Sequence, residues 1–291
     1  MRYAIRAVSE PVDILGESPV WNAREAALYW VDIRAPALRR LSRDGTVETW
    51  PMPDLVGAVV LRADGQLLLG LRGGLHTFDP ADGRLAPLLP IDEGHAENRI
   101  NDSRCDRAGR LWFSTMWDFG RRRTGSLYRL DGAVMQPEPV IRDLAVPNAV
   151  AFSPAGDRAY FADSADGAIH CLALDPRTGA LGPPQVFVPA GVVPGKPDGA
   201  TVDAEGFLWN ARFGAGIVAR FSPDGRLDRV VPLPVSNPTS CSFGGPHHAT
   251  LFVTTATQGL DDAQRRAQPL AGAVLAFEPG IGGLAEPAFA G

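Results

Sequence analysis

The sequence has few cysteines and no long apolar run, and both absences exclude classes of protein. Its three cysteines, Cys105, Cys171 and Cys241, are odd in number and show no CxxC spacing, which argues against a disulfide framework and a structural zinc site. No stretch approaches the roughly 18 apolar residues of a membrane span, and the N-terminal segment lacks the apolar core of a signal peptide. We therefore expect a cytoplasmic protein with no membrane partner.

Basic clusters and nucleotide motifs are equally scarce. The formal net charge is −5 and the longest basic run is the three arginines at 121–123, whereas binding to a phosphate backbone requires clustered cations. No GxGxxG or GxxxxGK[ST] pattern follows a predicted strand, so no nucleotide cofactor is indicated. Neither Ser18 nor Ser114 stands in the context of a Ser-His-acid triad. The sequence thus predicts neither a nucleic-acid partner nor a serine hydrolase.

Sustained helical periodicity is also missing, and turn residues are abundant instead. The chain of 291 residues contains 32 glycines and 26 prolines, spread along its whole length, which indicates many turns. Only residues 260–268 favour a short surface helix. All-β folds of this length often form one unit, so the length does not require two domains.

A turn followed by a strand recurs six times along the chain. The copies are separated by 39, 44, 48, 49 and 43 residues when they are marked at Leu28, Leu67, Leu111, Ala159, Leu208 and Leu251. A second strand signal, bounded by Gly, Asp or Pro, follows each copy, as expected for hairpins. This period is typical of four-stranded propeller blades. We predict a single all-β domain over residues 1–291, a six-bladed β-propeller with a central channel, closed by a strand within residues 3–8.

Four of the predicted innermost strands begin with a carboxylate or a carboxamide at nearly the same place. Glu17 and Asn148 lie 11 residues before the marks of their blades, and Asn101 and Asp198 lie 10 residues before theirs. Matched positions in a propeller predict a ring of side chains at one mouth of the channel. Such oxygens suit a divalent cation such as Ca²⁺, Mg²⁺, Mn²⁺ or Fe²⁺, with Zn²⁺ as a further candidate. The alternative is that the Asn and Asp residues only form Asx turns where their strands start.

Five segments carry a resemblance to a known family. They span the chain from the first to the fifth of the six predicted blades: LGESPVW (15–21), RIND (99–102), PNAVAFSP (147–154), YFADS (160–164) and PDGATVDAEGFLW (197–209). In order and spacing they resemble the senescence marker protein, gluconolactonase and luciferin-regenerating-enzyme-like family of propellers. The resemblance implies a sugar lactonase, a carboxylic ester hydrolase that converts an aldonolactone, such as a pentono- or hexonolactone, to the aldonic acid in oxidative sugar catabolism.

The resemblance also implies roles for individual residues. The implied ligands of the single metal ion are Glu17, Asn148 and Asp198. Asp198 would also serve as general base for the attacking water, while Arg99 and Asn101 would contact the substrate. Some members complete the substrate pocket with a carboxylate after the third-blade strand. Asp118 is the only acid in the corresponding segment here, so we expect it to contact the substrate.

Two other functions fit the same residues. A promiscuous metal-dependent esterase or organophosphate hydrolase would use the same ion, and a non-catalytic propeller would bind Ca²⁺ or a protein partner. Arg99 and Asn101 beside the metal ring favour an enzyme, because a structural ion needs no polar groups facing the channel; the other interpretation of Arg99 is a surface arginine. We expect a monomer or weak dimer whose partner is a small-molecule sugar lactone.

Overall fold

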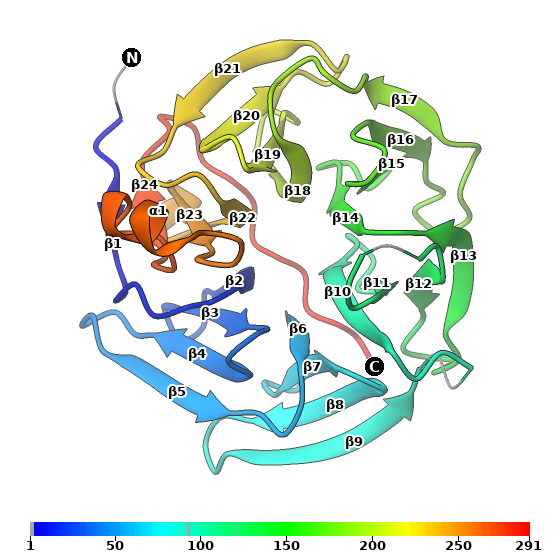
Figure 1. The fold of residues 1–291 in the computed structure, drawn as a ribbon. Coiled ribbons are helices and arrows are strands. Elements are labelled where there is room, and N and C mark those ends of the chain that lie inside the picture. Colours follow the sequence, from blue (N-terminus) through cyan, green and yellow to red (C-terminus); the bar gives the residue numbers. More distant parts are fainter. Residues whose placement is uncertain (1–2, 92–93, 121) are drawn as a thin grey trace.

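Six four-stranded antiparallel sheets surround a central axis (Figure 1). The computed structural model describes residues 3–91, 94–120 and 122–291. In five sheets the strands follow one another along the chain, as in the order β2-β3-β4-β5. The predicted six-bladed propeller of four-stranded blades is confirmed.

The strands take four equivalent positions from the channel outward. The innermost strands are β2 (Gly16–Asn22), β6 (Val56–Leu61), β10 (Asn98–Cys105), β14 (Pro147–Phe152), β18 (Lys196–Val202) and β22 (Pro238–Gly244). The second strands are β3 (Ala27–Asp32), β7 (Leu67–Leu71), β11 (Leu111–Trp117), β15 (Arg158–Asp163), β19 (Leu208–Phe213) and β23 (Thr250–Thr255). The third strands are β4 (Ala37–Leu41), β8 (Gly74–Asp79), β12 (Gly125–Leu130), β16 (Ile169–Ala173), β20 (Ile217–Phe221) and β24 (Leu275–Phe277). The outer strands are β5 (Val47–Pro51), β9 (Arg84–Pro90), β13 (Glu138–Leu144), β17 (Gln185–Val188), β21 (Leu227–Pro232) and β1 (Arg6–Ala7).

The N-terminal strand closes the ring. The sixth sheet has the order β1-β24-β23-β22, and Arg6 pairs with Ala276 in it. The predicted closing strand within residues 3–8 is therefore confirmed, although only Arg6–Ala7 forms regular strand. The short helix expected at 260–268 is α1 (Asp262–Ala267), which begins with a capping box at Asp261. A 3₁₀ turn, η1 (Pro246–His248), precedes β23.

Tryptophans fill the core between blades. Trp30, Trp112 and Trp209 are completely buried. The indole Nε1 of Trp112 donates to Asp106 Oδ2 at 2.9 Å, and that of Trp209 donates to Asp203 Oδ2 at 2.8 Å, in both cases to the aspartate six residues upstream. A buried indole needs an acceptor. The repeated spacing shows that the same tryptophan–aspartate hydrogen bond is used in two blades.

The C-terminal segment crosses the axis of the propeller (Figure 1). The backbone N–H of Phe289 donates to Leu61 O at the end of β6, and the N–H of Ala290 donates to Gly109 O after β10. The side chain of Phe289 is completely buried, and Glu286 forms an ion pair with Arg104 near the end of β10. This segment covers the channel where the inner strands end, so the mouth where they begin is the accessible one.

Three further findings concern features that the sequence has little of. Cys105, Cys171 and Cys241 are all free thiols. Among the residues that the structure describes, no helix has the length and apolar character needed to cross a membrane. In the basic run, Arg122 pairs with Glu97 and Arg123 with Asp163, while Arg121 lies outside the described residues.

Candidate functional site

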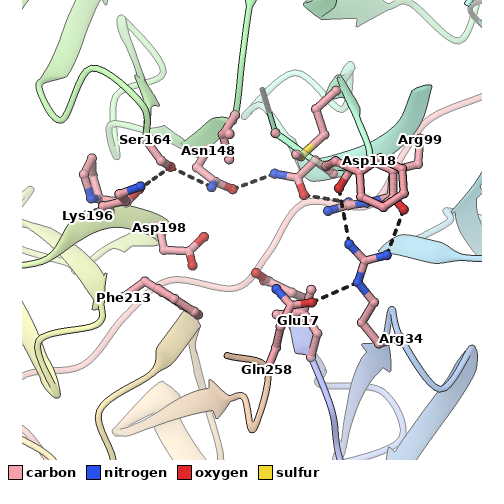
Figure 2. Close-up of a pocket in the computed structure, with 17 residues that line it drawn as sticks. Glu17, Arg34, Arg99, Asp118, Asn148, Ser164, Lys196, Asp198, Phe213 and Gln258 are labelled. Atoms are coloured by element: carbon pink, nitrogen blue, oxygen red, sulfur yellow. Dashed lines mark hydrogen bonds and ion pairs between the residues drawn. The ribbon is translucent and has the colours of Figure 1, made fainter. Parts of the chain in front are cut away.

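A cavity of about 220 Å³ opens at the mouth where the inner strands begin (Figure 2). Its walls come from the starts of four inner strands and from the loops that follow neighbouring strands. The structure brings together at this cavity all six predicted site residues: Glu17, Arg99, Asn101, Asp118, Asn148 and Asp198.

Bulges at the starts of the inner strands direct these side chains into the channel. Glu17 and Asn148 are the last residues paired with the second strand before the bulge, opposite Val31 and Ala162. Asn101 and Asp198 are the first unpaired residues inside it. A bulge redirects a side chain without ending the strand. The sequence offsets are 11 residues in two blades and 10 in the other two because the turn to the second strand differs by one residue: Trp21 pairs with Leu28 and Phe152 with Ala159, whereas Cys105 pairs with Leu111 and Val202 with Leu208.

The backbone after two of these residues is strained. Ser18 follows Glu17 with a φ of 53°, and Ala149 follows Asn148 with a φ of 58°. Left-handed conformations cost free energy in residues other than glycine, and they persist where surrounding structure requires them. Strained backbone of this kind is concentrated at functional sites, so the conformations of Ser18 and Ala149 mark Glu17 and Asn148 as candidate site residues.

Two carboxylates face the cavity without a basic partner. Figure 2 shows Glu17 and Asp198 directed toward its centre from β2 and β18, the inner strands on either side of β22. Burial raises the pKa of both, and neighbouring negative charge raises them further: Asp102 acts on Glu17, and Glu17 acts on Asp198. Arg99 lowers both pKa values only weakly. Asp198 is buried and Glu17 partly buried, and two carboxylates in this arrangement repel each other unless protons or a cation offset their charge.

The third candidate ligand, Asn148, has a defined amide orientation. Its Nδ2 donates to Ser164 Oγ at 2.9 Å, and Ser164 Oγ in turn donates to Pro197 O at 2.6 Å. Its Oδ1 accepts from Asn101 Nδ2 at 2.9 Å. The amide oxygen is thus held on the channel side, where two carboxylates and one amide oxygen form a donor set for a hard divalent cation.

These oxygens fit a metal ion through charge and donor type. Among the described residues, no three His, Cys, Asp or Glu side chains stand in a metal-binding arrangement; the set at the mouth has two carboxylates and takes its third oxygen from an amide. It also lacks the thiolates and imidazoles that soft metals prefer. A divalent cation would remove the repulsion between Glu17 and Asp198.

The opposite wall of the cavity holds paired arginines. Asp118, only 6% exposed, accepts from Arg99 Nε at 2.7 Å through Oδ1 and from Arg34 Nη1 at 2.8 Å through Oδ2. Burial raises the pKa of Asp118, but the hydrogen bonds and charges of Arg34 and Arg99 lower it more, so that it lies below its usual value. Arg99 is 4% exposed, so it is no surface arginine. Both oxygens of Asp118 are occupied, which suits a residue that holds arginines in place.

Among the other residues that line the cavity, the sequence analysis gave no role to Arg34, Ser164, Lys196, Phe213 and Gln258. Ser164 ends the quoted segment YFADS, and Lys196 directly precedes PDGATV, so their places beside motifs were available as signals. Arg34 and Gln258 follow second strands in loops, and Arg34 Nε donates to Gln258 Oε1 at 2.9 Å. Nothing in the spacing indicated that contact.

The comparison with known families decides the relationship. Residues 15–257 match the family described as SMP-30/Gluconolactonase/LRE-like region. The chain belongs to this family. The matched SMP-30/gluconolactonase/LRE-like region includes every residue that lines the cavity except Gln258. The predicted resemblance is confirmed.

Relatives within the SMP-30/gluconolactonase/LRE-like family include named lactonases. The chain is 37% identical over 294 residues to a 6-deoxy-6-sulfogluconolactonase of Pseudomonas putida, covering 100% of both chains. It is 35% identical to an L-arabinolactonase of Azospirillum brasilense, covering 95% of this chain and 92% of that one. A solved structure of regucalcin from Agrobacterium tumefaciens, described as a calcium-binding protein, aligns with a TM-score of 0.94 at 30% identity over 99% and 98% of the two chains.

Proposed function

We propose that this chain hydrolyses a sugar lactone to the aldonic acid, with one divalent metal ion held by Glu17, Asn148 and Asp198. The observation that carries the proposal is a pair of cavity carboxylates without a basic partner, Asp198 buried and Glu17 partly buried, facing two arginines across one small cavity. Named lactonases among the relatives support the reaction class. The calcium-binding description of the similar regucalcin structure supports a divalent cation.

The cavity offers a complete set of groups for this reaction. When bound, a divalent ion polarises a lactone carbonyl and acidifies water. An Asp198 carboxylate oxygen accepts the proton of the attacking water as its oxygen bonds to the carbonyl carbon. The bond between the carbonyl carbon and the ring oxygen then breaks, and the ring oxygen takes up the proton that Asp198 accepted. Arg99 offsets the negative charge that develops on that oxygen, because Asp118 holds its guanidinium at the cavity wall.

Asn101 and Asp118 take positioning roles in this proposal. Asn101 Oδ1 accepts from Arg99 Nη1 at 2.7 Å, and its amide nitrogen is engaged by Asn148 and by Pro147 O. Asp118 is similarly occupied by two arginines. Direct contact of either side chain with the sugar, as expected from the resemblance, would require exchange of an existing hydrogen bond.

A pH-stat assay tests the proposed function. Protein stripped of metal is given Ca²⁺, Mg²⁺, Mn²⁺, Zn²⁺ or Fe²⁺ separately and offered xylono-, arabinono-, galactono- and gluconolactones. We expect metal-dependent acid release from at least one lactone. Aryl esters and organophosphates in the same assay address the promiscuous hydrolase. Binding of metal without turnover of any substrate would favour the calcium-binding propeller instead. Cytoplasmic location and a monomeric or weakly dimeric state stay predictions from the sequence.

A further inference from the structure

Lys196 is the single lysine among the 28 lysine and arginine residues of the chain. It begins β18 two residues before Asp198, is exposed, and lines the cavity. Figure 2 shows it beside Ser164 and Asp198, across the cavity from Arg34 and Arg99. No ion pair or hydrogen bond joins its ammonium group to any other described residue. The cavity rim therefore presents one free positive charge.

A buried arginine holds the backbone that carries this lysine. Arg212 is 2% exposed and donates to three consecutive carbonyl oxygens, those of Val193 at 3.3 Å, Pro194 at 3.2 Å and Gly195 at 2.8 Å. Burial lowers the pKa of Arg212 to about 10, and no carboxylate stabilises its charge. Burying a cation without a carboxylate is costly. The hydrogen bonds that Arg212 donates to this turn are the structural role that its burial supports.

Gly195 adds a second constraint on the same turn. Its φ is +78°, and a Cβ there would lie 2.7 Å from Ala215 Cβ and 2.8 Å from Phe213 O. Only glycine fits so close an approach. Lys196 itself pairs with Phe213 across the strands. The backbone of Lys196 is therefore fixed before a ligand binds, which lowers the conformational entropy that the lysine loses on binding.

The charge of the cavity favours an anionic ligand. Its lining holds three carboxylates and three cationic side chains. A divalent ion at Glu17 and Asp198 would leave two positive charges in excess. Asp118 already neutralises part of Arg34 and Arg99, and Lys196 has no such partner. A neutral sugar lactone would leave the ammonium group of Lys196 without an anionic partner.

We propose that Lys196 binds a negatively charged substituent at the end of the sugar distant from the lactone carbonyl, and so selects acidic sugar lactones. Lys196 and Asp198 both line the cavity and are two residues apart on β18, so their Cα atoms lie roughly 7 Å apart along the strand, a separation comparable with the length of a six-carbon lactone. A carboxylate, a sulfonate or a phosphate would satisfy the same ammonium group. The inference rests on the proposed lactonase function.

The test compares gluconolactone with its 6-carboxylate, 6-sulfonate and 6-phosphate counterparts. We expect metal-loaded wild-type protein to have a higher kcat/KM for at least one acidic lactone than for the neutral one. The lactone with the highest kcat/KM identifies which acidic group Lys196 binds. Lys196→Met should lower the ratio of acidic to neutral kcat/KM roughly five- to tenfold, and Lys196→Arg should restore most of it. Arg84→Met, which removes an exposed cation from the outer strand β9, should leave the ratio unchanged.

Binding provides a readout without turnover. In calorimetry, the dianion glucarate should bind wild-type protein more tightly than gluconate, with a difference that shrinks in Lys196→Met and at high salt. An unchanged ratio in Lys196→Met, or a wild-type preference for the neutral lactone, would overturn the assignment of Lys196. Absence of turnover for every lactone would overturn the proposed function, whereas Lys196-dependent glucarate binding in that case would still support the anion site.

Discussion

Asn101 Nδ2 donates to Asn148 Oδ1 at 2.9 Å and so joins the arginine side of the cavity to its carboxylate side. Asn101 Oδ1 accepts from Arg99 Nη1, while Asn148 Nδ2 continues the chain to Ser164. One hydrogen-bonded line therefore runs through β10, β14 and the loop after β15. A change at Asn101 should affect both the proposed metal ligand and the arginine.

Asn101→Ala should weaken metal binding and turnover together. Asn148 loses the donor that orients its oxygen, and Arg99 loses an acceptor, so we expect a roughly tenfold to hundredfold loss of metal affinity or kcat. Calorimetry with Mn²⁺ and steady-state kinetics measure the two. Asn22→Ala is the matched control, because Asn22 is also a buried amide on an inner strand but lies at the far end of β2. Equal losses in both variants would contradict the proposed connection.

Asp118→Asn should destabilise the fold as well as the site. The substitution removes the carboxylate that Arg34 and the buried Arg99 share, and breaking one partner of a buried pair costs about 3 kcal/mol or more of unfolding free energy. Urea denaturation measures this cost, and kinetics should show a raised KM because the arginine wall moves. Glu138→Gln removes an acid that is 58% exposed and pairs with Arg129 away from this site, so it should cost less than about 1 kcal/mol. Similar costs for both variants would show that Asp118 is not a buried anchor.

The sequence predicted the ring of site residues because a repeated fold converts matched offsets into matched positions. Glu17, Asn148 and Asp198 could be placed at one mouth by counting from the strand marks. Counting could not show that the turn between the first two strands is one residue longer where the offset is 11 than where it is 10, since the turn length follows from the register of the paired strands.

The contacts of the cavity wall could not be predicted in the same way. Asp118 was visible as the only nearby acid, but its pairing with Arg34 joins loops of two different blades, 84 residues apart. Lys196 and Arg212 lie on paired strands. The sequence does not show, however, that Arg212 is buried or that its guanidinium donates to the carbonyl oxygens just before Lys196. Side-chain contacts between repeats carry no period, so offsets do not reveal them.

Asp198→Asn should remove turnover while leaving the propeller intact. The amide keeps the shape of the carboxylate but accepts no proton from water, and loss of a general base lowers kcat by roughly 10²- to 10⁴-fold. The rate is measured at saturating metal, with metal affinity followed separately, because the same change removes a charged ligand. Asp82→Asn, at an acid that is 58% exposed, is the control. Full turnover in Asp198→Asn would exclude this residue as the base.

The raised carboxylate pKa values predict opposite pH effects for metal-free and metal-bound protein. Burial first, and then the charge of Asp102, raises the pKa of Glu17 from 4.5 to about 8, and the pKa of Asp198 shifts in the same direction. Between these pH values the metal-free folded protein holds protons that the unfolded chain has released, so its unfolding free energy falls as pH rises. A divalent cation replaces those protons, and its affinity therefore rises with pH.

Thermal unfolding at pH 5 and pH 8 tests this linkage. The Tm of stripped protein should fall toward pH 8, and Mn²⁺ or Ca²⁺ at about a hundredfold excess over Kd should raise it by roughly 5–10 °C there, with a smaller gain at pH 5. Glu17→Gln should flatten the pH dependence and remove most of the metal gain, because the variant carries neither the shifted proton nor the anionic ligand. Glu48→Gln, at an acid that is 45% exposed on β5, should behave as wild type. An equal metal gain at both pH values would show that the ion binds without displacing protons, and thus away from the pair formed by Glu17 and Asp198.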